Sequence, residues 1–159
     1  MISQRADGLH ERYEPDGCYV CSIAMMAYEA RDPSEPITLR VMANAFVALN
    51  ESRALSYRYK DWSKRGLFVM DAEKVAQYFA PGITYIESMN VGTNDHTSKS
   101  LHEILSVLHR SHRAVEKWRV EREGGGAWVH FTYGNYDPWP GSITRRDGEL
   151  VGLRIFRLP

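Results

Sequence analysis

The chain has 159 residues, which is the size of a single domain. Hydrophobic residues make up 43% and charged residues 25%, and 20 basic side chains balance 20 acidic ones, so the composition excludes a disordered chain and a strongly charged one. Because the basic residues are scattered among acids, nucleic acid is not an expected partner. The start of the sequence has no apolar run of a secretory signal, and no window has the length of a membrane span, so we expect a cytoplasmic protein without membrane association.

Two helices are predicted in the first third of the chain. Apolar residues recur at helical spacing from Cys18 to Arg31, and Pro33 blocks continuation of this run. The same pattern recurs from Thr38 to Ser52, with Thr38 placed to cap the first turn. We therefore expect a largely buried first helix, followed by a second helix.

The middle of the chain mixes strands, helices and a loop. An apolar run at 67–70 predicts a strand, and Asp71 is a suitable N-cap for a short helix that stops at Pro81-Gly82. A strand is expected over 83–89, and a polar loop over 90–99. The spacing of apolar residues then predicts a helix from Ser100 to Arg113.

The C-terminal third is expected to be an antiparallel meander. Extended chain is predicted from Val115, a strand over 127–133 follows three glycines, and a last strand covers 150–156. Helices precede strands along the chain, which is the order of an α+β fold. Because no repeat or long linker divides the sequence, residues 1–159 are expected to form one domain.

Cys18 is the candidate nucleophile. It follows Asp16-Gly17 at the start of the first predicted helix, where unpaired backbone N–H groups and the positive end of the helix dipole lower the pKa of a thiol. Such a thiol becomes a nucleophile when a base lies near it. An uncharged amide donor upstream, Gln4, could help the backbone N–H of Cys18 to stabilise an oxyanion.

His130, in the predicted strand region, is the best-placed base, and Asp137 is the candidate to orient its imidazole. If Gly134-Asn135 form a two-residue hairpin turn, Thr132 lies opposite Asp137, and His130 shares its face as a diagonal neighbour. A three-residue loop would turn Asp137 to the other face, so the register decides between the two arrangements.

These motifs resemble the papain-like peptidase family typified by bacteriocin-leader-processing domains, and they are similar to related phage- and spirochaete-associated proteins. The motifs that carry the resemblance are, in chain order, Ser3-Gln4-Arg5 with Asp7, Asp16-Gly17-Cys18 before an apolar helix, His130-Phe131, and Tyr136-Asp137-Pro138-Trp139. The likeness covers both ends of the chain and leaves the stretch 50–123 supported only by a similar alternation of elements. The chain departs from the family at Tyr19, where a glycine is usual, and in its short spacing from His130 to Asp137.

The resemblance implies a papain-like fold in which N-terminal helices pack on a C-terminal antiparallel sheet. It also implies a thiol protease or amidase that cleaves an amide bond, with Cys18 as nucleophile, His130 as base, Asp137 as orienter and Gln4 as oxyanion donor. The substrate would be a polypeptide or a peptidoglycan-type amide. No metal or other cofactor is expected, and the sequence does not indicate the oligomeric state.

Other interpretations of the same residues remain open. Tyr19 and the short spacing favour a catalytically inactive papain-like binding protein, encoded by a phage and acting on a host component. Cys18 and Cys21 have the spacing of a thiol-disulfide oxidoreductase, although no convincing strand precedes them. As zinc ligands the two cysteines lack clustered partners. A further interpretation is that Cys18 is a small buried hydrophobe, as a lone cysteine at the start of an apolar helix often is.

Overall fold

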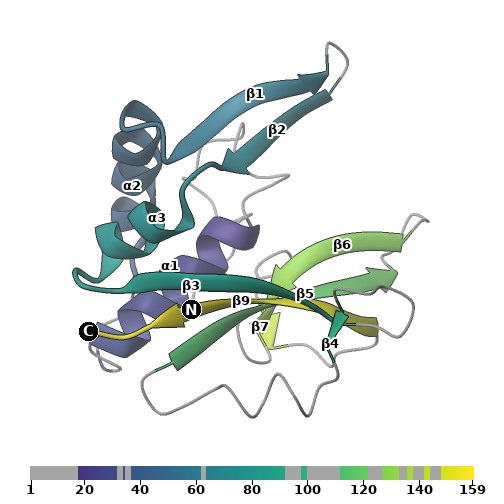
Figure 1. Ribbon diagram of the computed structural model, residues 1–159. Helices are drawn as coiled ribbons and strands as arrows, with labels where there is room; N and C mark the ends of the chain where they lie inside the picture. Colours follow the sequence, from purple (N-terminus) through teal and green to yellow (C-terminus); the bar gives the residue numbers. More distant parts are fainter. Residues whose placement is uncertain are drawn as a thin grey trace.

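The computed structural model shows a mixed α+β fold (Figure 1). The residues that it describes are 18–31, 34, 37–61, 64–91, 98–99, 112–121, 127–132, 136–137, 142–143 and 148–159. Among them are the helices α1 (Cys18–Arg31), α2 (Leu39–Glu51) and α3 (Ala72–Phe79). The strands are β1 (Leu55–Asp61), β2 (Lys64–Val69), β3 (Thr84–Val91), β4 (Ser98–Lys99), β5 (His112–Glu121), β6 (Ala127–Thr132), β7 (Tyr136–Asp137), β8 (Ser142–Ile143) and β9 (Gly148–Arg157).

The helices begin where the sequence predicts them. The side chain of Thr38 accepts a hydrogen bond from the N–H of Val41, and that of Asp71 accepts one from the N–H of Lys74, so each residue caps the helix that follows it. Helix α1 covers the predicted range without a change at either end. These predictions are confirmed because helix limits depend on contacts within a few residues.

The main sheet has five strands in the order β4-β3-β9-β5-β6. All its pairs are antiparallel except the short parallel pair of β3 and β4. The last strand, β9, lies between β3 and β5, so the predicted meander of the C-terminal third is wrong. Within this sheet, β5 and β6 follow each other in the chain and pair antiparallel, as a meander requires, but β9 pairs with β5 and β3 instead of extending the sheet beyond β6. Strands β1 and β2 form a separate two-stranded sheet, which projects from the α2 and α3 end of the fold (Figure 1).

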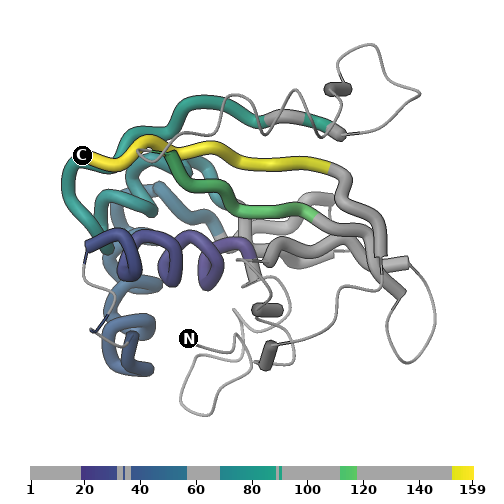
Figure 2. The backbone as a smooth tube through the Cα atoms, turned by 90° about the horizontal axis from the view of Figure 1, so that it is seen from below, coloured from purple at the N-terminus to yellow at the C-terminus, as the bar shows by residue number. Residues whose placement is uncertain are grey.

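Helix α1 forms the centre of the core. Its residues 20–28 are all buried, which encloses the helix on every side over two and a half turns. The helix packs on the sheet, which contributes Val115 and Phe156 to the same cluster, and on α3, while buried residues of α2 belong to that cluster as well. Figure 2 shows α1 running along one face of β9 and β5.

Two further predictions differ from the structure. Residues 100–111 of the predicted helix 100–113 lie outside the described residues, but His112 and Arg113 belong to β5, so the helix does not reach its predicted end. Both ends of the predicted polar loop 90–99 belong to strands, because Asn90 and Val91 of β3 pair with Ser98 and Lys99 of β4. In the part of the chain that the structure describes, no helix has the length and apolar character that crossing a membrane requires.

Candidate functional site

The candidate site lies at the start of α1. Cys18 is the first residue of this helix, as predicted, and the structure describes its backbone. His130 lies in β6 and Asp137 in β7, where again the backbone is described, whereas Gln4 lies outside the described residues. Helix α1 lies against both β5 and β6, so the strand of His130 is a neighbour of the helix that begins with Cys18.

The two ends of α1 have different neighbours. At its last residue, Nη1 of Arg31 donates a hydrogen bond of 3.3 Å to the backbone carbonyl of Phe79 in α3, and the Arg31 guanidinium stacks 4.6 Å from the centre of the Tyr28 ring. At its first turn, Tyr19 meets Arg154 of β9. The last residue of α1 therefore contacts α3, and its first turn contacts β9.

Tyr19 anchors the first turn of α1 on the sheet. Its phenol is half-buried, and burial raises its pKa to about 12, against a weaker opposing effect of the Arg154 guanidinium, which donates a hydrogen bond to the phenol oxygen. Tyr85 of β3 lies near enough to Tyr19 to affect the same pKa, and its hydroxyl is hydrogen-bonded to that of Ser88. Tyr19 thus joins the start of α1 to β9 through Arg154 and lies close to Tyr85 of β3.

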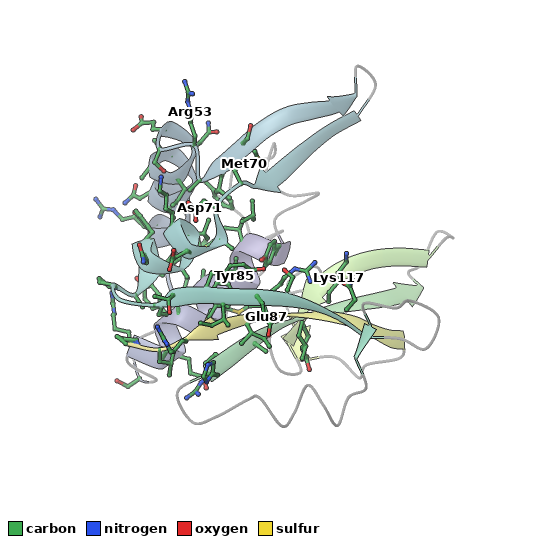
Figure 3. The ribbon with its side chains drawn as sticks, viewed as in Figure 1. Arg53, Met70, Asp71, Tyr85, Glu87 and Lys117 are labelled. Atoms are coloured by element: carbon green, nitrogen blue, oxygen red, sulfur yellow. The ribbon has the colours of Figure 1, made fainter. Side chains whose placement is uncertain are left out.

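The ladder registers show which sheet residues share a face with α1. Directly opposite residues of antiparallel strands lie on one face, and the face alternates along each strand. Val115 is in the core cluster with α1, and it pairs with Arg154. Two residues further along β5, Lys117 pairs with Gly152 of β9 on one side and with Phe131 of β6 on the other. Lys117 therefore lies on the face of α1, one ladder step beyond Val115 (Figure 3).

His130 occupies the alternate ladder position. It pairs with Trp118, and the ladder of β5 and β6 has no register shift from Glu116 to Glu121. Position 130 therefore belongs to the face of Glu116, which pairs with Leu153. Leu153 is buried, yet it is not in the cluster that contains α1. The backbone thus assigns His130 to the opposite face of the sheet from α1, one residue away from the position that shares a face with the helix.

The predicted hairpin that would place Asp137 beside His130 is wrong. Among the described residues, β7 pairs with β8, with Asp137 opposite Ser142, and β6 pairs only with β5. Strand β7 is nevertheless close to β6 in space. Residues 133–135, which would form the predicted turn, lie outside the described residues.

The second cysteine of the first turn, Cys21, is part of the hydrophobic core. Cys21 is fully buried within the core of α1. Among the described residues, no group of three or more histidine, cysteine, aspartate or glutamate side chains is arranged to hold a metal ion. The zinc interpretation therefore finds no support in that part of the chain.

Sequence reasoning did not single out Lys117 or Arg154. Their signal is weak in the sequence, because a basic residue in a strand is ordinary until the register shows which face it occupies. Comparison of the chain with protein-family models, with curated proteins and with solved structures finds no match.

Proposed function

We propose that the chain is a cytoplasmic cysteine hydrolase of papain-like fold that cleaves an amide bond in a polypeptide or a peptidoglycan-type substrate. The observation that supports it best is the position of Cys18, which begins a buried helix packed on the strand pair β5 and β6. The unpaired N–H groups at a helix start stabilise a thiolate and can also donate to an oxyanion. The resemblance at both ends of the chain supplies the other site residues.

In this proposal the reaction has two steps. The Cys18 thiolate attacks the amide carbonyl carbon, and the oxyanion accepts hydrogen bonds from the Cys18 N–H and the Gln4 side chain. His130, oriented by Asp137, protonates the leaving amine as the carbon–nitrogen bond breaks. Water, deprotonated by His130, then attacks the thioester, which releases the carboxylic acid and restores the thiolate.

A second candidate is a papain-like binding protein without catalytic activity. The observation that favours it is the ladder position of His130, which pairs with Trp118 on the face away from α1. For His130 to reach Cys18, the register of β6 would have to shift by one residue or the strand would have to twist at this point. The anchored Tyr19 agrees with either candidate, because it fixes the helix start in both.

Alkylation of Cys18 by iodoacetamide, followed by mass spectrometry from pH 5 to pH 9, tests the proposal. We expect Cys18 to react rapidly below neutral pH, while the buried Cys21 serves as the internal control. His130→Ala should remove the rapid reaction, and His112→Ala, a matched histidine change in β5, should preserve it. An ordinary thiol profile for Cys18 in the wild-type protein would refute the hydrolase and leave the binding protein as the better interpretation.

A further inference from the structure

Strands β1 and β2, with the residues that join them to the helices, form an arm that comprises residues 52–70. The two strands pair with each other as a separate sheet, and β1 also lies against α2. At the base of the arm Leu55 is buried, and its ladder partner Val69 packs against the core cluster. Beyond this base the arm projects from the fold, and Figure 3 shows Arg53 and Met70 where it leaves the helices. A two-stranded sheet is marginally stable by itself, and a further strand stabilises it.

The arm concentrates positive charge. Five of the 20 basic residues of the chain and one of its 20 acidic residues lie in the arm, so its net charge is +4 and that of the remaining chain is −4. The balance of charge over the whole sequence hides this local excess, which becomes apparent once the bounds of the arm are known. A partner of the arm is therefore expected to be anionic. The charged residues of the arm are Arg53, Arg58, Lys60, Asp61, Lys64 and Arg65.

Each strand of the arm has an open edge. The N–H of Met70 donates a hydrogen bond of 2.8 Å to the carbonyl of Ala54, which continues the β1–β2 ladder by one pair. Because hydrogen-bonded pairs alternate with non-hydrogen-bonded ones, Ser56 and Phe68 form the next hydrogen-bonded pair. Among the described residues, no further strand pairs with either edge. The residues whose backbone N–H and C=O groups point outward are Tyr57 and Tyr59 in β1 and Arg65 and Leu67 in β2.

We propose that the arm binds an acidic polypeptide segment in an extended conformation, which adds to one of the two open edges as a third strand. The backbone of the segment pairs with the outward N–H and C=O groups of the edge, and its carboxylates complement the net positive charge of the arm. This inference goes beyond the proposed function. It holds for the hydrolase and for the binding protein alike, because binding at the arm requires no catalytic step.

Two other occupants fit the arm less well. A second copy that paired through the same edge would bring together two arms of net charge +4, and like charges on facing strands destabilise the pair. A nucleic acid would neutralise the cations, but its phosphate groups supply only acceptors and would leave the outward C=O groups of the edge without donors. An extended polypeptide supplies donors and acceptors in turn, at the spacing of a strand. The open edge and the charge together therefore favour an acidic polypeptide.

The test measures binding of a fluorescent peptide of about ten residues, in which glutamate and threonine alternate, to the full chain by fluorescence anisotropy at low salt. Arg58→Gln with Lys64→Gln, which removes one cation from each strand, should weaken binding about tenfold. Arg40→Gln with Lys74→Gln removes the same charge from exposed positions of α2 and α3, and should preserve the affinity within about twofold. The same peptide with all its backbone amides N-methylated keeps its charge, loses every N–H donor and should bind at least about tenfold more weakly. Circular dichroism of each variant confirms that it is folded.

Amide hydrogen exchange with and without the peptide shows how it binds. New protection of the N–H groups of Tyr57 and Tyr59, or of Arg65 and Leu67, supports strand addition. Absence of binding, or equal losses in the two double variants, overturns the proposal. Equal binding of the N-methylated peptide shows attraction by charge alone and also overturns it. Tighter binding of a single-stranded oligonucleotide of equal charge would assign the arm to nucleic acid, and dimerisation that protects the same N–H groups without peptide would assign it to a second copy.

Discussion

Arg154 in the last strand donates a hydrogen bond to the phenol oxygen of Tyr19 in the first helix. This contact joins the two ends of the described chain and fixes the first turn of α1 on the sheet. Because the phenol is half-buried, its neutral form is favoured in the folded state, and its pKa is raised to about 12.

The raised pKa of Tyr19 predicts a loss of stability at high pH. A tyrosine phenol ordinarily has a pKa of 10.0, so the stabilisation is fully present below pH 10 and is lost as the pH rises toward 12. At pH 11.5 the lost stabilisation amounts to about 2 kcal/mol in the free energy of unfolding. In Tyr19→Phe the fall in stability between pH 9 and pH 11.5, measured by urea denaturation, should be smaller by this amount. Parallel curves for the two proteins would contradict the assignment.

The end of α2 contains a residue in an unfavourable conformation. Arg53 follows the C-cap Ser52 with φ of 63°, in the left-handed region that favours glycine. We expect Arg53→Gly to raise the free energy of unfolding by about 1 kcal/mol. Arg53→Ala is the matched control, since it removes the same side chain but keeps Cβ, and it should give no comparable gain. Equal stability of the glycine and alanine variants in thermal denaturation would show that φ is not the cause.

The N-cap of α3 predicts a second change in stability. Oδ1 of Asp71 accepts a hydrogen bond of 3.1 Å from the backbone N–H of Lys74. Asp71→Ala should lower the free energy of unfolding by about 1 kcal/mol, because this N–H then loses its partner. Asp71→Asn retains an acceptor oxygen and should lose much less. Chemical denaturation of the three proteins checks this, and an identical loss in both variants would exclude the cap as the cause.

The turn after α3 depends on glycine for two separate reasons. Gly82 has φ of 90°, and a Cβ on this residue would lie 2.8 Å from Cβ of Pro159. Gly82→Ala should therefore destabilise the fold by about 2 kcal/mol through backbone strain and overpacking. In a Pro159→Gly background the same substitution should cost less, because only the backbone term remains. An unchanged cost in that background would show that the contact with Pro159 contributes nothing.

The local features of this protein follow from the amino-acid sequence alone. The range of α1, the caps Thr38 and Asp71, and the stop near Pro81-Gly82 were all predictable. Each depends on a side chain and a backbone group a few residues apart, or on the spacing of apolar residues within one helix. The start of α1 at Cys18, which makes this thiol a candidate nucleophile, is of the same kind.

Which sheet residues share a face with the helix that begins at Cys18 depends on the tertiary structure. The insertion of β9 between β3 and β5, and the registers of β5 with β6 and β9, place Lys117 and Arg154 on the face of α1 and His130 at the alternate position. A shift of one residue in any of these ladders would exchange the two faces, and nothing within a single strand fixes it. The register is set by packing between segments that are distant in sequence, which is why the arrangement of the candidate site was not predictable from its motifs.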